Sequence, residues 1–219
     1  MNRMFKEVTE TWNPLEGECP HHCSYCWARK LIKRHNMAKY RGEPRIIEKE
    51  MKRKFKDGSF VFVQDMSDLF ANGVPTQCII KILKYIEQFP NVTFLLLTKN
   101  PKRYHEFNIP KNCICGCTIE TNREYHASLA PSTYLRLMEM WYLGHPRKMI
   151  SIEPIMDFDL NTFVLALGIL NGLEFVYIGY DNYNNHLPEP SLDKTMKLIR
   201  ELETFTEVRT KTLREKWDK

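Results

Sequence analysis

Short apolar runs recur along the chain and alternate with longer segments that are apolar on one side only. Most runs are rich in β-branched and aromatic residues, which is typical of strands in a parallel sheet that is covered on both faces. We predict strands over residues 5–12, 59–64, 92–98, 113–120, 148–153 and 173–179, and a short last strand over 207–213.

The segments between these runs have the spacing of amphipathic helices. Within residues 76–89, for example, Ile79, Ile82, Leu83 and Ile86 form one apolar stripe. Similar patterns, with suitable start and stop residues, predict further helices over residues 27–41, 44–56, 102–107, 132–144, 159–172 and 191–202.

A strand followed by a helix, repeated along the whole chain, predicts an α/β fold with a parallel sheet. The chain has 219 residues and no linker or low-complexity tract, so we expect a single domain over residues 1–219. A closed eight-stranded barrel typically needs about 250 residues. We therefore predict a partial (β/α)6 barrel, an incomplete TIM-like barrel, and keep a doubly wound open sheet as the alternative.

The composition adds an expectation about the compartment. No apolar run approaches the length of a membrane span and the N-terminus carries no secretory signal, so we expect no membrane insertion. Seven cysteines, three of them crowded into one short run, do not have the pattern of a secreted disulfide framework. We expect a cytoplasmic protein, because a reducing compartment keeps thiols available for a metal.

The charge is mild in total but uneven along the chain. Lys and Arg number 32 against 27 Asp and Glu, a formal net charge of +5 that by itself establishes no nucleic-acid partner. Cations are concentrated between Arg29 and Lys56. Such a run is usually a solvated helical face, and the alternative is a surface that faces phosphate groups.

The densest candidate chemistry is the run CPHHCSYC. Cys19, Cys23 and Cys26 can bind one inorganic centre within a single loop. A [4Fe–4S] cluster held by three cysteines leaves one iron open to another ligand. A zinc site would need a fourth protein ligand, for which His21 or His22 is available, although residues inside a metal loop are more often exposed spacers.

This run resembles the CxxxCxxC loop of radical S-adenosylmethionine (SAM) enzymes, including an aromatic residue, Tyr25, before the third cysteine. The resemblance implies that Cys19, Cys23 and Cys26 hold a [4Fe–4S] cluster after the first strand of a full or partial (β/α) barrel. In that superfamily the open iron binds SAM, and an electron from the cluster cleaves SAM to a 5′-deoxyadenosyl radical that abstracts hydrogen from the substrate. The resemblance also implies that Tyr25 borders the adenine, and that an external electron donor of the flavodoxin or ferredoxin type is needed.

Ligands of parallel α/β folds bind at the carboxyl ends of the strands, so polar residues there are the next candidates. Each one alone is as often simply solvated as functional. The second to sixth predicted strands are followed by Asp65, Ser67, Asp68, Thr98, Lys99, Glu120, Thr121, Asn122, Glu153, Tyr180, Asp181 and Asn182.

Six strand-end motifs extend the resemblance. TWNPLEGEC, QDMSDLF, LLTKNPKR, CTIETN, ISIEP and YIGYDN, in this order, resemble those of a phage- and prophage-associated radical-SAM-like family of unassigned function, over about residues 11–182. By position in that series, Ser67 and Asp68 would receive the amino group of SAM, although the usual Gly-Gly-Glu sequence is absent. GYDNYNN stands where such proteins typically have a glycine-rich stretch, so the substrate or adenine end of the site can differ here.

The same series assigns the later strand ends. Lys99 could meet the carboxylate of SAM by a charge-assisted hydrogen bond. Glu120 or Asn122 could hold the ribose hydroxyls. Glu153 could do the same or help to seat the substrate, and its alternative is a buried carboxylate tied to neighbouring strand ends.

Cys113, Cys115 and Cys117 alternate along one strand and therefore share a face. Buried cysteines commonly pack as small apolar residues, and we prefer that interpretation for all three. If Cys117, the one nearest the carboxyl end, faces the barrel mouth, it could donate a hydrogen atom as a catalytic residue. Tyr180 and Tyr183 follow the sixth strand and could stack on a base.

Two functions from different classes follow. The first is a radical SAM enzyme, and the basic run with the late tyrosines favours a nucleotide or nucleic acid as its substrate. The second is a non-catalytic module, stabilised by zinc or an iron–sulfur cluster, that binds nucleic acid or another protein. A SAM-dependent spectrum of the bound metal centre separates the two.

Overall fold

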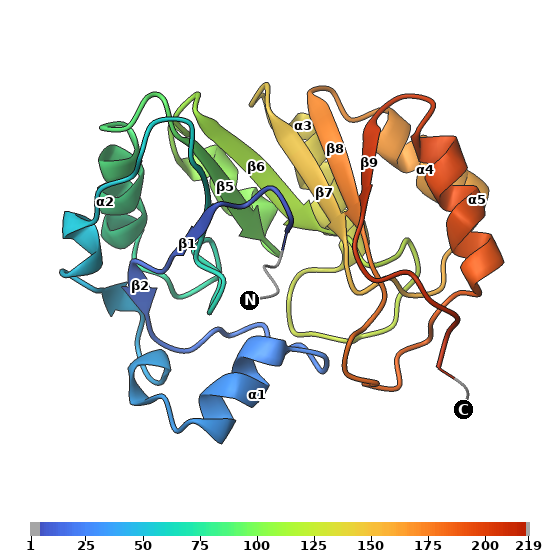
Figure 1. Ribbon diagram of the computed structural model, residues 1–219, viewed down its shortest axis with the longest axis horizontal. Helices are drawn as coiled ribbons and strands as arrows, with labels where there is room; N and C mark the ends of the chain where they lie inside the picture. Colours follow the sequence, from blue (N-terminus) through green and yellow to red (C-terminus); the bar gives the residue numbers. More distant parts are fainter. Residues whose placement is uncertain (1–4, 218–219) are drawn as a thin grey trace.

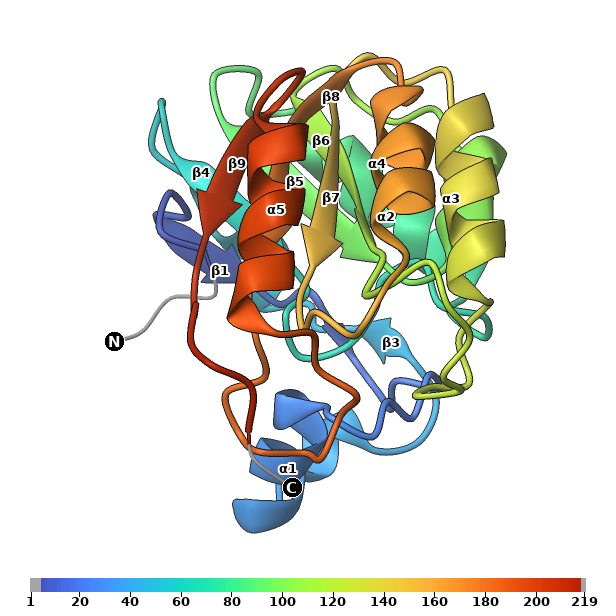
Figure 2. The ribbon, with the colours of Figure 1, turned by 90° about the vertical axis from the view of Figure 1, so that its right-hand side faces the viewer.

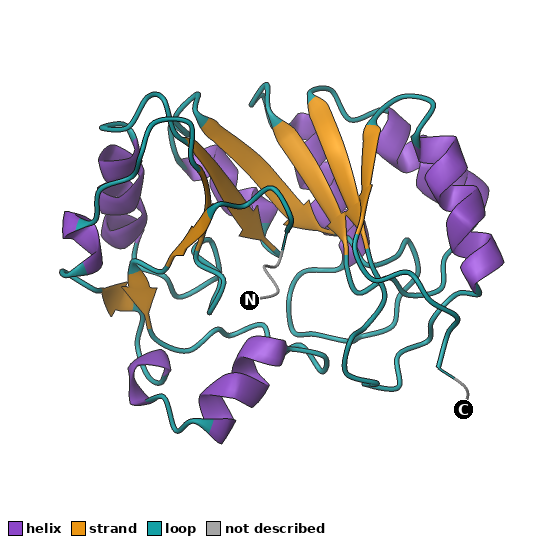
Figure 3. Ribbon diagram, in the orientation of Figure 1, coloured by secondary structure: helices purple, strands orange, loops and turns teal. Residues whose placement is uncertain are grey.

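The computed structural model describes residues 5–217, and its centre is a parallel sheet (Figures 1 and 3). Two further short strands, β2 (Leu15–Glu16) and β3 (Arg45–Ile46), form a separate antiparallel pair. The strands of the main sheet are β1 (Glu10–Trp12), β4 (Phe60–Val63), β5 (Thr93–Thr98), β6 (Cys113–Thr118), β7 (Lys148–Ile152), β8 (Leu173–Ile178) and β9 (Glu207–Thr210).

The strands lie side by side in the order β1-β4-β5-β6-β7-β8-β9, and every neighbouring pair is parallel. A parallel pair needs a crossover, which brings each connection back over the same face of the sheet. Figures 1 and 2 show the helices on that outer face. They are α2 (Thr76–Ile86), α3 (Thr133–Tyr142), α4 (Leu160–Gly168) and α5 (Leu192–Leu202), with a 3₁₀ helix (Pro101–Glu106) between β5 and β6.

Helix α1 (Trp27–Arg34) lies apart from the others. It sits beyond the carboxyl ends of the strands, on the side to which the strand arrows point in Figure 2. The segment between β2 and α1, which holds the three crowded cysteines, therefore passes across the strand ends. None of the helices within residues 5–217 is long and apolar enough to cross a membrane.

Side chains alternate between the two faces of the sheet and form two apolar cores. The larger core lies between the sheet and the helices and contains all three cysteines of β6. The smaller core covers the inner face. There the ring centroid of Phe5 lies 4.2 Å from that of Tyr177 and 5.6 Å from that of Phe62, so the N-terminal segment closes the inner face.

The predicted α/β fold is confirmed, as a partial barrel whose strands fall where the apolar runs lie. The largest difference among the strands is β1, which spans Glu10–Trp12 rather than residues 5–12. Phe5 and Val8 instead pack into the inner core. An apolar residue that can pack without a ladder partner gives the same sequence signal as one within a strand.

The predicted helix over residues 44–56 is wrong. Arg45–Ile46 forms β3 against Leu15–Glu16, and only a 3₁₀ turn, Glu50–Lys52, follows. Gly17 makes this pairing fit: its φ is +107°, and a Cβ at this position would lie 2.6 Å from the Cα of Pro44. Because the backbones at Gly17 and Pro44 approach so closely, Arg45–Ile46 can pair with Leu15–Glu16 as a strand. The helical spacing of apolar residues does not predict such a pairing.

Two predicted helices differ in detail. Helix α1 ends at Arg34 rather than near residue 41, because Asn36 takes a left-handed conformation with φ of +47°. The buried side of α3 includes Arg136, whereas the neighbouring Leu135 is 52% exposed. The buried guanidinium of Arg136 pairs with Glu120 at the strand ends, 2.8 Å from its Oε2.

Candidate functional site

The cysteine loop lies at the carboxyl ends of the sheet, between β2 and α1 (Figure 1). Cys19, Cys23 and Cys26 are free thiols and half-buried. Cys26 is the N-cap residue of α1, and its Sγ accepts a hydrogen bond from the backbone N of Arg29 at 3.4 Å. Burial raises the pKa of Cys19 to about 12, so a metal must displace the proton of this thiol to bind it.

Backbone hydrogen bonds fasten this loop to the segment that follows β6. The N–H of Ser24 donates to the carbonyl of Ala127 at 2.9 Å, and the N–H of Leu129 donates to the carbonyl of His21 at 2.6 Å. These bonds do not depend on side-chain identity. On the side of β6, these two backbone hydrogen bonds therefore hold the cysteine loop in place.

A buried pair, His21 and Asp68, fastens the loop on its other side. Nε2 of His21 lies 2.8 Å from Oδ2 of Asp68, which also accepts from the hydroxyl of Thr98 at 2.9 Å and the backbone N of Lys99 at 2.8 Å. Oδ1 accepts from the backbone N of Phe70 at 2.9 Å. Burial by itself would raise the pKa of Asp68, but these hydrogen bonds and His21 hold it below its ordinary value.

Glu120, at the end of β6, is the centre of a second buried network. Its Oε1 accepts from the hydroxyl of Tyr25 and lies 3.1 Å from Nζ of Lys99. Its Oε2 lies 2.8 Å from Nη1 of Arg136, a buried residue of α3. Three of the predicted site residues, Tyr25, Lys99 and Glu120, therefore meet at one point.

The electrostatics of this network are dominated by its cations. Burial would raise the pKa of Glu120, but Lys99, Arg136 and the hydroxyl of Tyr25 lower it to about 2. Burial is the largest influence on Lys99 and would lower its pKa, but the negative charges of Glu120 and of the Cys23 sulfur together raise that pKa above its ordinary value. One carboxylate thus faces two cations, and the excess positive charge suits an anionic group of a ligand.

Glu153, at the end of β7, is less completely satisfied. Its Oε1 lies 2.8 Å from Nζ of Lys211, which follows β9. Its Oε2 is buried and has no hydrogen-bond partner among residues 5–217. Burial raises the pKa of Glu153, against the opposing effects of Lys211 and Lys99. An unsatisfied buried carboxylate oxygen is costly, and it can accept a hydrogen bond from a ligand.

The two other predicted contact residues have structural partners. Oγ of Ser67 accepts from Nε2 of Gln64 at 2.8 Å. The side-chain amide of Asn122 donates to the carbonyl of Asp159 and to Oγ1 of Thr162, and its Oδ1 accepts from the backbone N of Asp159. Both amide hydrogens of Asn122 are used to hold the start of α4, so its predicted ribose contact stays a prediction without support from the geometry.

Cys117 lies in the core between the sheet and the helices and is fully buried. The catalytic hypothesis for Cys117 required its thiol to face the barrel mouth. The thiol lies on the helix side of β6, so this condition is not met. Core packing is the role that remains for it. Tyr180 is also buried, with its hydroxyl 2.7 Å from Oγ1 of Thr195, so it is not exposed for stacking on a base, whereas Tyr183 is 59% exposed.

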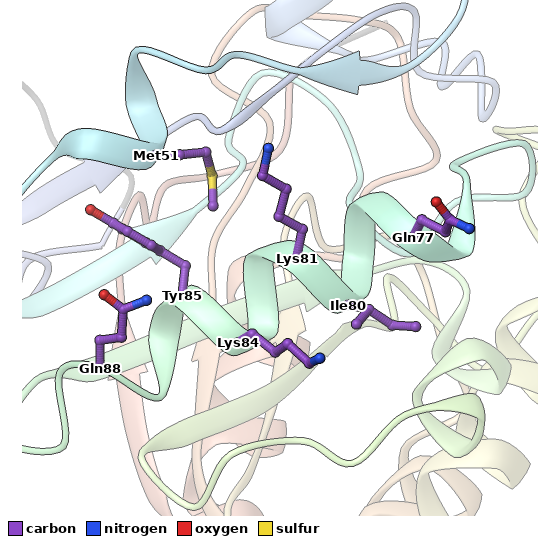
Figure 4. A pocket seen from close by; sticks show the side chains of 7 residues that line it. All are labelled: Met51, Gln77, Ile80, Lys81, Lys84, Tyr85 and Gln88. Atoms are coloured by element: carbon purple, nitrogen blue, oxygen red, sulfur yellow. The ribbon is translucent and has the colours of Figure 1, made fainter.

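An open groove of about 520 Å³ lies on the outer side of α2 (Figure 4). It is lined largely by α2 itself and contains none of the strand-end residues that the sequence singled out. A smaller cavity adjoins Glu120 and the segment after β6. Side chains of Met51, Gln77, Ile80, Lys81, Lys84, Tyr85 and Gln88 surround the groove in Figure 4.

The thiol donors can be tested against the two kinds of metal centre. Within residues 5–217, no group of three or more His, Cys, Asp or Glu side chains is closed around a position for a single metal ion. His21, one of the two candidates for a fourth zinc ligand, is engaged with Asp68 through Nε2. A [4Fe–4S] cluster binds each thiolate through a different iron, so the three thiols need not converge on one metal ion. The three loop cysteines therefore fit a cluster better than a single zinc ion.

Sequence reasoning missed His21 and Arg136. The expectation that the loop histidines are exposed spacers is wrong for His21, which is 5% exposed, whereas His22 is exposed. An arginine on the buried side of α3 needs a carboxylate partner, and Glu120 is that partner. The signal for Arg136 was its position beside Leu137 on an amphipathic helix. No sequence signal would have paired His21 with Asp68, because Asp68 lies in the separate loop that follows β4.

Comparison with protein-family models gives the family. Residues 4–180 match the model described as "Protein of unknown function (DUF5131)". The chain belongs to this family. Among curated proteins no match was found. The DUF5131 match covers the cysteine loop and the ends of the first six strands of the main sheet, where the two buried networks lie.

Solved structures of spore photoproduct lyase have a similar fold. A cysteine-to-serine mutant is 12% identical with a TM-score of 0.65, covering 96% of this chain and 80% of that one. A tyrosine-to-phenylalanine mutant is 13% identical with a TM-score of 0.64, covering 89% and 74%. A double mutant with bound AdoMet and dinucleoside spore photoproduct is 13% identical with a TM-score of 0.60, covering 89% and 61%. The DUF5131 chain therefore shares the partial-barrel fold of spore photoproduct lyase.

Proposed function

We propose that this DUF5131 protein is a radical SAM enzyme. The observation that carries the proposal is the position of the cysteine loop: three free thiols lie across the carboxyl ends of a partial barrel, fastened there by the buried contact between His21 and Asp68. The structure of spore photoproduct lyase with bound AdoMet supports the choice of cofactor, since it has the same fold.

Cys19, Cys23 and Cys26 would hold a [4Fe–4S] cluster and leave one iron open. When bound, the cluster and SAM would supply reductive cleavage of the sulfonium–C5′ bond and removal of a hydrogen atom from the substrate, with one electron from an external flavodoxin- or ferredoxin-type donor. The protein would orient SAM and the substrate and exclude water from the strand ends.

The residues at the strand ends suggest how SAM would be oriented. The excess positive charge of Lys99 and Arg136 beside Glu120 suits the carboxylate of SAM, and the two spare protons of the Lys99 ammonium can donate to it. The unpartnered Oε2 of Glu153 would accept from a ribose hydroxyl or from the substrate. Tyr25, held by Glu120, would border the adenine.

Ser67 and Asp68 remain our proposed neighbours of the amino group of SAM. The carboxylate of Asp68 already accepts four hydrogen bonds, so its main effect would be indirect, through the position of His21 and of the backbone of Lys99. The cytoplasm, as the compartment where the thiols stay reduced, is part of the proposal.

Anaerobic reconstitution with iron and sulfide tests the function. We expect about four irons per chain, an electron paramagnetic resonance spectrum that changes when SAM is added, and 5′-deoxyadenosine after reduction with dithionite. Cys23→Ala should lose the cluster, whereas Cys78→Ala, a half-buried thiol of α2, should retain it.

Two results would overturn the proposal in favour of the non-catalytic module. The first is a colourless protein with one zinc ion per chain. The second is a cluster whose spectrum does not respond to SAM, together with no 5′-deoxyadenosine.

A further inference from the structure

Helix α1 presents a cationic face beside the candidate site. Its apolar side, which includes Ala28 and Leu31, packs against Tyr40 and Met66. An eight-residue helix with one face packed must expose the opposite face, and in α1 that face contains no acidic residue. The exposed cations of α1 are Arg29, Lys30, Lys33 and Arg34.

The cations of α1 differ from most arginines elsewhere in lacking a carboxylate partner. Within residues 5–217, Arg29, Lys33 and Arg34 form no ion pair. By contrast, Arg147 pairs with Glu174 at 2.5 Å. Like charges placed close together on a helix repel each other and destabilise it. An anionic partner would remove that repulsion.

The position of α1 connects this face to the site. The helix begins directly after Cys26, and it lies beyond the strand ends in Figure 2. Nζ of Lys30 hydrogen-bonds to Oδ1 of Asn185 in the loop after β8, and it lies 5.6 Å from the ring centroid of Tyr183. Tyr183 is 59% exposed, so its ring is available beside the cations.

Cations that contact phosphates, next to an exposed aromatic ring on which a base can stack, are the two parts of a single-stranded nucleic-acid site. An acidic protein would use the cations but would have no particular need for the ring. A free nucleotide would need only one or two cations, whereas α1 offers a row of them along its length. The row of cations together with the exposed ring therefore favours a nucleic-acid strand with several phosphates as the ligand.

We propose that the face formed by Arg29, Lys30, Lys33, Arg34 and Tyr183 binds a single-stranded nucleic acid and brings one of its nucleotides to the strand-end site. The delivery of a nucleotide rests on the proposed radical SAM function, whereas the binding does not. The bound strand supplies the phosphates that the cations of α1 lack within the chain.

Fluorescence anisotropy with a labelled single-stranded oligonucleotide, recorded over a range of salt concentrations on the full chain, tests the binding. The double variant Arg29→Gln and Lys33→Gln should bind more weakly, with a slope of log K against log salt reduced by about 1.4, because each single-strand phosphate contact contributes about 0.7. The matched control, Lys84→Gln and Lys197→Gln, removes the same charge from the exposed sides of α2 and α5 and should leave the slope unchanged.

Tyr183→Ala separates stacking from charge. We expect it to weaken binding by roughly 5- to 150-fold, which corresponds to about 1–3 kcal/mol of stacking per base, while the salt slope stays the same. Circular dichroism confirms that each variant is folded before binding is measured.

Three results would overturn this inference. In the first, the control lowers the slope as much as the α1 variant, so that binding follows net charge alone. In the second, Tyr183→Ala binds as tightly as the unmodified chain. In the third, the α1 variant binds the oligonucleotide normally but slows cluster reduction by an acidic electron carrier, which would make α1 the docking face for the electron donor.

The failures of the two proposals can be told apart. Oligonucleotide binding is measured on protein before reconstitution, so binding without SAM cleavage would count against the radical SAM function alone. SAM cleavage with no oligonucleotide affinity would count against this inference alone.

Discussion

The buried carboxylates on the two sides of the strand ends differ in how completely the chain satisfies their oxygens. On the side of β4 to β6, Asp68 and Glu120 have hydrogen-bond or ion-pair partners on both oxygens, all of them supplied by the chain. On the side of β7 and β9, one oxygen of Glu153 faces Lys211 and the other has no hydrogen-bond partner in the described part of the chain.

This difference separates groups that position the site from a group that is available to a ligand. A fully satisfied buried carboxylate holds neighbouring segments together, and its removal leaves its partners unsatisfied. An unsatisfied oxygen already carries a desolvation cost, which a ligand can relieve. The comparison predicts large stability effects on the first side and binding effects on the second.

The largest effect is expected from Glu120→Ala. This change leaves the buried Arg136 and the partly buried Lys99 without their carboxylate and should lower the free energy of unfolding by about 3–5 kcal/mol. Urea denaturation measures it. The control Glu124→Ala removes an exposed carboxylate from the segment after β6 and should change stability by less than about 0.5 kcal/mol. A similar small loss for Glu120→Ala would mean that the network does not position the strand ends.

Asp68→Asn should have an intermediate effect of about 1–3 kcal/mol, since an amide retains one acceptor oxygen but adds donors facing Thr98 and the backbone of Lys99. The reconstituted variant should also hold less iron per chain after gel filtration, because His21 no longer fastens the cysteine loop. Asp57→Asn, on an exposed turn, is the control and should retain iron. Full iron retention by Asp68→Asn would contradict the fastening role.

The smallest stability effect is expected from Glu153→Gln, at most about 1 kcal/mol at pH 7. Burial raises the pKa of Glu153 in the folded state. Its contribution to the free energy of unfolding is therefore fully present below its pKa in the unfolded chain, about 4.3, and is lost as pH rises through its pKa in the folded protein. The variant should therefore gain stability relative to the original chain as pH rises above that range. Paired urea titrations at several pH values measure this difference.

Glu153→Gln should also weaken SAM binding about tenfold, the equivalent of about 1.4 kcal/mol for one hydrogen bond to a charged acceptor. Equilibrium dialysis of the reconstituted protein measures the affinity. Unchanged affinity would show that Oε2 of Glu153 does not contact SAM, and its substrate role would then be the remaining proposal.

Much of the fold was predictable because its signals are local. Buried parallel strands read as apolar runs, and helices as stripes, so β4 to β8 and α2, α4 and α5 were predicted close to their observed bounds. The segment at residues 44–56 failed because its conformation depends on pairing with Leu15–Glu16, far away in sequence. The spacing of apolar residues within this segment carried no information about that partner.

The candidate site divides in the same way. The sequence by itself determined the three thiols of the loop, the polar residues at each strand end, and through them the chemistry worth proposing. Only the tertiary structure decided which of those residues meet: His21 with Asp68, Tyr25 and Arg136 with Glu120, and Cys117 with the core instead of the mouth. The physical reason is that a residue's type is local, whereas its partners come from strands and helices that only the parallel packing of the sheet brings to one edge.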